Sequence, residues 1–221
     1  MNPSGTPRDR MLPLASERKS MPLRRMAALL LVAMAAALSG CGINAIPSYE
    51  EQAKAAWSQV LNQYQRRADL IPNLVETVRA SASHERSTLE AVVNARAKAT
   101  QTPIPADILT NPEAMKQFQQ NQGELSSALS RLMVVVERYP DLKANQNFLT
   151  LQAQLEGTEN RISVARRDFI DAVRQYNTEL KTIPGRWWAA LLYPEAKEMA
   201  QFEADATAAE VPKVDFGTAN Q

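Results

Sequence analysis

The sequence predicts an all-α protein, folded as an antiparallel up-and-down four-helix bundle, and three observations support this. Apolar residues recur at alternating steps of three and four over long stretches, as in amphipathic helices, and no stretch shows the period of two of a half-buried strand. Only 7 glycines occur in 221 residues, too few for turn-dense β-folds or glycine-rich phosphate loops. Short connections between long helices favour antiparallel neighbours.

The N-terminal residues are typical of a secretory signal. A basic region precedes Met26–Ser39, which carries no charged residue. The sequence Leu38-Ser39-Gly40-Cys41 resembles the lipobox of bacterial lipoproteins, in which the chain is cut before the cysteine and the cysteine is acylated. We therefore expect residues 1–40 to be a signal peptide and Cys41, the sole cysteine, to anchor the chain through lipid.

A retained transmembrane helix over residues 26–46 is the alternative, because this span is close to the ~20 apolar residues that cross a bilayer. In either case Arg24 and Arg25 stay in the cytoplasm and the remainder is exported. Gly42 after the cysteine, rather than Asp, favours the outer membrane facing the periplasm if the cell is Gram-negative. Three methionines can start the chain: Met1, Met11 and Met21.

The first helix of the bundle is expected to begin at Ser48, which forms a capping box with Glu51. Residues 41–47 are then an anchor linker, and the bundle covers residues 48–184. Pro72 removes one helical hydrogen bond, so a kink is expected there rather than a stop. The apolar stripe of this helix is Trp57, Val60, Tyr64, Ile71, Leu74 and Val78.

A break within residues 82–87 is expected to separate the first helix from a second one, capped by Ser87 and Glu90. The alternative is a single helix over residues 49–100. With four antiparallel helices, the end of the last helix returns to the start of the first; with one long first helix, it lies at the opposite end.

The third and fourth helices have clear boundaries. Three prolines mark a loop at 102–112, and Asn111-Pro112-Glu113 is a typical helix start. The last helix continues through Gly157 to Pro184-Gly185, and its stripe is Phe148, Leu151, Leu155, Thr158, Ile162, Ala165, Phe169, Ala172, Tyr176, Leu180 and Ile183. Residues 185–221 are expected to be a Trp-containing segment of one or two helical turns, followed by a flexible tail.

With these elements in place, several segments resemble the LemA family of bacterial envelope proteins: residues 56–78, 84–96 and 159–177, and the terminal PKVDFG at 212–217. The resemblance implies a four-helix bundle held at a membrane by its N-terminus, without established catalytic activity, and with a TPM-domain protein as partner. Relatives tend to have an Asn-containing, Phe- and Gly-rich segment after the last helix, where this chain has Arg186-Trp187-Trp188.

The residues offer little for catalysis or metal binding. His84, the only histidine, lies near Glu85 and Glu90, but one histidine cannot supply the two Glu-x-x-His motifs of a di-iron bundle. The carboxylate pairs Asp168/Asp171 and Glu156/Glu159 are typical of a charged outer face. With 25 Lys and Arg against 24 Asp and Glu, the chain lacks the basic surplus of a nucleic-acid binder. We therefore expect that the protein is not an enzyme and that it binds no cofactor or metal ion.

Two groups of residues are candidate partner surfaces. Polar residues near Pro72 and on the last helix form either a buried network that fixes helix register or a recognition groove: Arg67, Asp69, Asn73, Arg161, Arg166 and Asn177. Trp187 and Trp188 form either a lid over the bundle end or an interface with a protein or lipid headgroups.

The sequence as a whole predicts a membrane-anchored, extracytoplasmic helical bundle with a structural or adaptor role, acting through helix-face contacts with an envelope protein. The alternative is a binder of lipid or another apolar small molecule, held between helices splayed at Pro72.

Overall fold

The computed structural model describes residues 27–28 and 42–202, and the fold lies in the unit that begins at Gly42. Every regular element in residues 42–202 is an α-helix, which confirms the all-α class. The helices are α2 (Ala45–Ser81), α3 (Arg86–Gln101), α4 (Pro112–Val136), α5 (Pro140–Lys143), α6 (Gln146–Lys181) and α7 (Gly185–Leu192).

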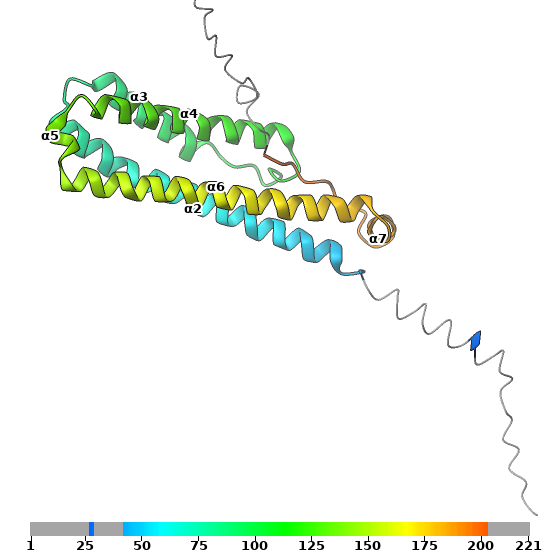
Figure 1. The fold of residues 1–221 in the computed structure, drawn as a ribbon. Coiled ribbons are helices and arrows are strands. Elements are labelled where there is room, and N and C mark those ends of the chain that lie inside the picture. Colours follow the sequence, from blue (N-terminus) through cyan, green and yellow to red (C-terminus); the bar gives the residue numbers. More distant parts are fainter. Residues whose placement is uncertain (1–26, 29–41, 203–221) are drawn as a thin grey trace, which may run out of the picture. The chain divides into compact units, whose positions relative to one another are not determined.

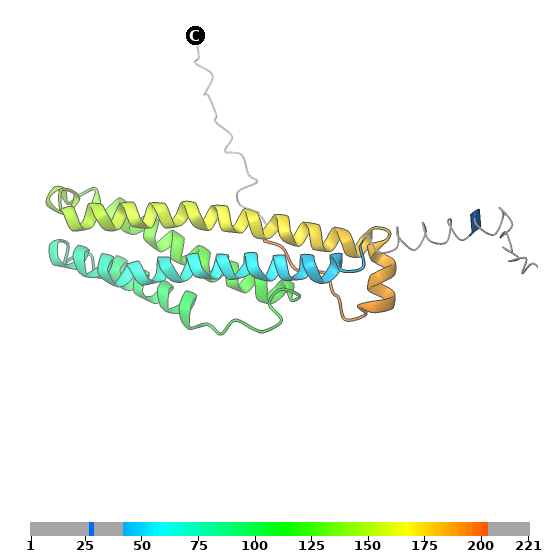
Figure 2. The same ribbon diagram turned by 90° about the horizontal axis from the view of Figure 1, so that it is seen from below.

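The four long helices alternate in direction along the chain (Figures 1 and 2). Helix α2 packs along α6, and α3 packs along α4. The short α5 joins α4 to α6 at one end, and α7 lies across the other end, beside the start of α2 (Figure 2). This arrangement is consistent with the up-and-down four-helix bundle expected from the sequence.

Helix α2 begins at Ala45, so the predicted start at Ser48 is wrong. Gly42, with φ of 120°, turns the chain so that the amide of Ala45 donates to its carbonyl at 3.0 Å. Asn44 is the N-cap residue without a side-chain hydrogen bond, and Ser48 and Glu51 lie inside the helix. The earlier start places Ile46 in the core, where it is 1% exposed.

The predicted break between the first two helices is confirmed, and the alternative of one helix over 49–100 is wrong. Helix α2 ends at Ser81 and α3 begins at Arg86. The cap of α3 differs from the prediction, because Glu85 is the N-cap residue and Ser87 lies within the helix. Buried Ala82 fixes the turn, since its amide donates to Val78 at 2.8 Å.

The start of α4 and the length of α6 agree with the sequence. The Asn111 side chain accepts a hydrogen bond from the amide of Ala114 at 3.2 Å, and Pro112 occupies the first turn. Helix α6 passes through Gly157 without interruption. The stripe of α6 ends before Ile183, which lies beyond the helix and is 65% exposed.

The core consists of two apolar clusters, one toward α5 and one toward α7. The α5-side cluster includes Leu74, Val92, Leu132 and Phe148. The α7-side cluster includes Trp57 and Tyr64 on α2, and aromatic rings from three other parts of the chain: Phe118, Phe169 and Phe202. A buried polar side chain, Arg67, lies between the two clusters along α2.

The chain after α7 corrects the prediction of a flexible tail, as far as Phe202. Residues 193–202 return along the bundle, and Met199 and Phe202 are buried in the α7-side cluster. The amide of Ala200 donates to the carbonyl of Leu109 at 2.7 Å, which ties this segment to the loop before α4. The rest of the predicted tail, 203–221, lies outside the described residues.

Candidate functional site

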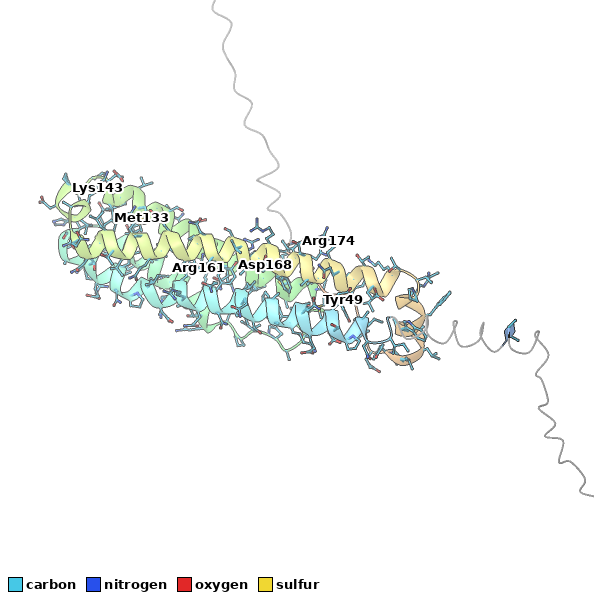
Figure 3. All side chains as sticks on the ribbon, turned by 60° about the horizontal axis from the view of Figure 1, so that its bottom comes forward. Tyr49, Met133, Lys143, Arg161, Asp168 and Arg174 are labelled. Atoms are coloured by element: carbon cyan, nitrogen blue, oxygen red, sulfur yellow. The ribbon has the colours of Figure 1, made fainter. Side chains whose placement is uncertain are left out.

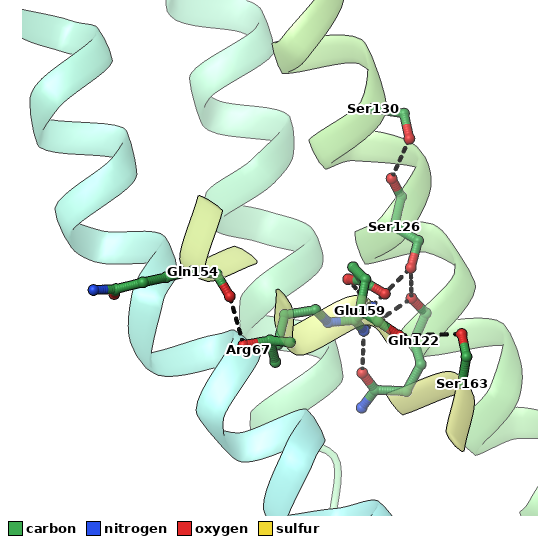
Figure 4. Close-up of polar contacts among 8 residues, drawn as sticks. Arg67, Gln122, Ser126, Ser130, Gln154, Glu159 and Ser163 are labelled. Carbon is green, nitrogen blue, oxygen red and sulfur yellow. Dashed lines mark hydrogen bonds and ion pairs between the residues drawn. The ribbon is translucent and has the colours of Figure 1, made fainter. Parts of the chain in front are cut away.

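Arg67 is the centre of a polar layer in the middle of the bundle (Figure 4). Its side chain is 1% exposed. One terminal nitrogen donates to Ser126 Oγ at 2.8 Å and to Glu159 Oε1 at 2.9 Å. The other donates to Gln122 Oε1 at 2.6 Å and to the Gln122 carbonyl at 3.3 Å.

The polar layer joins all four long helices. Arg67 belongs to α2, Gln122 and Ser126 to α4, and Glu159 to α6, while Gln122 Nε2 donates to the carbonyl of Ala99 on α3 at 3.3 Å. A buried guanidinium with directional partners on several helices strongly disfavours sliding of one helix along another. The layer therefore supports the reading of these residues as a network that fixes register.

Tyr64, one turn before Arg67, completes the surroundings of the guanidinium. The Arg67 carbon Cζ lies 5.0 Å from the centre of the Tyr64 ring. Burial raises the pKa of the Tyr64 hydroxyl above its usual value, and the positive charges of Arg166 and Arg67 oppose this shift. Arg67 Nε is buried and has no hydrogen-bond partner in the described part of the chain.

Most of the other predicted members of the network lie elsewhere. Asp69, Asn73 and Arg161 are exposed, so the prediction that they form a buried network with Arg67 is wrong. Asp69 accepts a hydrogen bond from Gln65 at the surface of α2. The two carboxylates of the Glu156/Glu159 pair also differ in their surroundings. Glu156 is exposed, whereas Glu159 forms an ion pair with Arg67.

Arg166 and Asn177 hold the returning segment 193–202 against α6. The side-chain nitrogen of Asn177 donates to the carbonyl of Met199, and its side-chain oxygen accepts from the amide of Met199, both at 2.9 Å. The Arg166 guanidinium lies over the Phe202 ring, 4.6 Å from its centre. These two predicted partner-surface residues are thus engaged by the chain itself.

Asn73 and Arg161 line a surface groove between α2 and α6, which we call the α2/α6 groove. It consists of two adjoining hollows that share Thr150. Asn73 lies at one end of the groove. Arg66 and Arg161 lie at the other end, where Gly157 also lines the groove. Figure 3 shows Arg161 on α6. The groove offers two guanidinium groups beside a shallow floor.

The two tryptophans of α7 have different surroundings. Trp188 is half-buried and packs on the α7-side cluster with Ala189, as a lid over the bundle end would. Trp187 points away from the core and is 62% exposed, and Leu191 on the same side of α7 is 73% exposed. The packing of Trp188 agrees with the lid reading, whereas the exposed Trp187 stays a prediction of an interface.

Among residues 27–28 and 42–202, no group of three or more His, Cys, Asp and Glu side chains could hold a metal ion. Glu85, beside His84, instead accepts hydrogen bonds from Arg138 and from the Tyr139 hydroxyl. No helix in the same ranges has the length and apolar character to span a bilayer. Cys41 and most of the alternative membrane span 26–46 lie outside the described residues.

The partners of Arg67 on α4 were not predicted from the sequence, although a signal for them exists. Gln122 lies between Phe118 and Leu125 at steps of four and three, so it occupies a core position of the stripe of α4. Arg67 occupies the equivalent position between Tyr64 and Ile71 on α2. Polar residues at core positions of two helices therefore mark the layer.

Comparison with known proteins identifies the family. Magnetosome protein MamQ of Magnetospirillum gryphiswaldense is 26% identical over 164 residues, which cover 67% of this chain and 60% of that protein. Magnetosome proteins MamQ 1 and MamQ 2 of Paramagnetospirillum magneticum are each 30% identical over 90 residues, or 41% of this chain. The chain matches between 32% and 60% of the length of these relatives. Residues 56–216 match the LemA family, which confirms the resemblance seen in the sequence: the chain belongs to the LemA family.

Proposed function

We propose that this protein is a membrane-anchored, extracytoplasmic adaptor of the bacterial envelope, which recognises a partner protein through a helix face and catalyses no reaction. Family membership and the likeness to the magnetosome proteins suggest a membrane-associated protein. The anchor is a lipid on Cys41, and the outer membrane facing the periplasm is the location in a Gram-negative cell. Both details follow from the lipobox-like sequence and Gly42.

The observation that carries the proposal is the α2/α6 groove on a bundle of fixed register. The Arg67 layer connects α2 to α6 through Glu159, so the two walls of the groove are held in one alignment before any partner binds. A preformed surface loses little conformational entropy on binding, which favours recognition of a rigid partner.

The chemistry of the groove indicates the kind of partner. Arg66 and Arg161 present positive charge, and Leu149, which lines the same hollow, is 42% exposed. A helix with acidic residues next to an apolar side chain would match these groups, in the way that amphipathic helices bind grooves. The TPM-domain protein implied by the family resemblance is the partner we propose to test first.

The alternative, a binder of lipid or another apolar molecule between splayed helices, has less support. The hollow nearest Pro72 is lined mainly by polar side chains: Asn73, Glu76, Thr77, Asn147, Thr150 and Leu151. A bound acyl chain would need an apolar, enclosed cavity at that place. Recovery of a lipid with the purified protein would favour this alternative.

Photocrosslinking in living cells tests the adaptor proposal. A photoreactive amino acid replaces Leu149 in the groove, and a control replaces Val93 on α3, which is 45% exposed and lies outside the groove. We expect a discrete protein adduct at Leu149 that is absent at Val93, with mass spectrometry identifying the partner. The same adducts at both positions, or none at Leu149, would contradict the proposal.

A further inference from the structure

Helix α7 presents an apolar surface that no other described residue covers. Three of its eight residues are large, apolar and exposed: Trp187 at 62%, Leu191 at 73% and Leu192 at 48%. The opposite side, with Trp188 and Ala189, packs on the α7-side cluster. Arg186 is the only charged residue of the helix. The helix therefore presents apolar side chains both to the core and to the solvent.

The start of the folded unit lies directly beside this helix. A Cβ atom built on Gly42 would lie 3.8 Å from Pro184 Cγ and 3.9 Å from Trp188 Nε1, so Gly42 is next to the start of α7. Gly42 follows Cys41 in the sequence, and consecutive Cα atoms are 3.8 Å apart. An anchor on Cys41 is therefore joined by a single peptide bond to a residue that lies beside α7.

We infer that α7 lies flat in the headgroup layer of the bilayer that holds the N-terminus, with Trp187 and Leu191 inserted among the lipids. The inference rests on the membrane anchor of the proposed function and names a second, non-covalent contact with the same membrane. Indole rings settle at the boundary between headgroups and acyl chains, and a single positive charge such as Arg186 is compatible with lipid phosphates.

The place of α7 beside the anchored end of the chain favours lipid as the occupant of this surface. Eight residues bury too little apolar area for independent binding, but a weak contact adds to an anchor that already holds the helix at the bilayer.

This placement orients the whole bundle. Helix α7 lies across the end at which α2 begins and α6 finishes (Figure 2). With α7 on the membrane, the 36 residues of α6 extend away from it over about 54 Å at 1.5 Å per residue. The α2/α6 groove is then held above the bilayer surface, where a partner protein can reach it.

The test uses the full chain, produced with its lipid or other anchor, purified and reconstituted in vesicles of phosphatidylethanolamine and phosphatidylglycerol. A photoreactive amino acid replaces Leu191, and the matched control replaces Val134 on α4, which is 71% exposed. Circular dichroism checks that both variants are folded. Flotation in a density gradient measures attachment to the vesicles, and mass spectrometry after irradiation counts lipid adducts.

We expect both variants to float, with lipid adducts at least tenfold more frequent at Leu191 than at Val134. Floating vesicles with equal adducts at both positions, or with only adducts to a second copy of the chain at Leu191, would overturn the inference but leave the anchor intact. Failure of both variants to float would overturn the anchor of the proposed function and this inference with it.

Discussion

Arg96 Nε on α3 donates a hydrogen bond at 2.8 Å to the carbonyl oxygen of Ala68 on α2. In a regular helix this carbonyl would accept from the amide four residues later, but that residue is Pro72, which has no amide hydrogen. The side chain of one helix therefore supplies the hydrogen bond that the sequence of its neighbour removes. This contact allows α2 to pass through Pro72 without leaving a buried acceptor unpaired.

This relationship predicts a coupling between Arg96 and Pro72. Replacing Arg96 with alanine should lower the free energy of unfolding by about 1–2 kcal/mol, because it removes a charge-assisted hydrogen bond to a carbonyl that Pro72 deprives of its usual helical donor. In a Pro72→Ala background, the new amide at residue 72 can bond Ala68, so Arg96→Ala should cost about half as much or less. Urea denaturation of the four proteins in this cycle measures the coupling. Equal losses in both backgrounds would show that Arg96 acts only through packing.

The Arg67 layer predicts a difference between two substitutions of the same residue. Arg67→Ala should lower the free energy of unfolding by about 3 kcal/mol, because it leaves a cavity and removes the partner of the Gln122 side chain. Arg67→Met should cost less, since it refills the apolar volume between the two clusters. Chemical denaturation compares the two variants, with Asn73→Leu as an exposed control on the same helix, expected to change stability by less than about 0.5 kcal/mol. A larger loss for Arg67→Met than for Arg67→Ala would rule out this account.

The sequence was informative where periodicity or a local motif decides the structure. The helical class, the Asn111 cap, the unbroken α6 and the break after Ser81 all follow from patterns within one segment. The starts of α2 and α3 were predicted wrongly, because capping boxes at Ser48 and Ser87 compete with the burial of Ile46 and the turn at Ala82. Tertiary packing overrides a weak local preference in such cases.

The candidate site was harder to predict, because its contacts join residues far apart in the sequence. Polar character and proximity to Pro72 placed Arg67 and Asn73 in one network, but Arg67 is buried and Asn73 is exposed. Nothing in the polar, proline-containing sequence after α7 indicated that Met199 and Phe202 are buried. That outcome depends on Asn177, whose amide matches the backbone of Met199 only once α6 and the returning segment lie side by side.

Asn177→Ala should release residues 193–202 locally. Loss of both hydrogen bonds to Met199 leaves the segment held by apolar contacts and by the tie between Ala200 and Leu109. We expect the Met199 amide to exchange its hydrogen about 5- to 30-fold faster, since two hydrogen bonds contribute about 1–2 kcal/mol. Hydrogen exchange followed by mass spectrometry reads this segment directly. Arg174→Ala, an exposed change on the same helix, is the control and should leave exchange at Met199 as it is.

The buried tyrosines predict a loss of stability in alkaline solution. Burial raises the pKa of Tyr64 and of Tyr176 above their usual value near 10. Above pH 10 the unfolded chain therefore releases protons that the folded chain retains, so the free energy of unfolding falls as pH rises. Below pH 10 these groups are neutral in both states and the effect is absent. Denaturation at several pH values from 8 to 11 should show a shallower alkaline decline for Tyr64→Phe, and an unchanged slope would contradict this assignment.

Replacement of glycine by alanine is expected to have opposite effects on stability at Gly185, where α7 begins, and at Gly123, inside α4. A Cβ atom on Gly185 would clash with the carbonyl oxygen of Glu179, a backbone atom of α6 that cannot move away easily. Gly185→Ala should therefore displace α7 and cost about 1–3 kcal/mol. Gly123 lies inside α4 with open space at its Cβ position, so Gly123→Ala should stabilise the protein by about 0.5–1 kcal/mol through helix propensity. Thermal denaturation of both variants checks the two signs. A neutral Gly185→Ala would mean that α7 can dock without its close approach to α6.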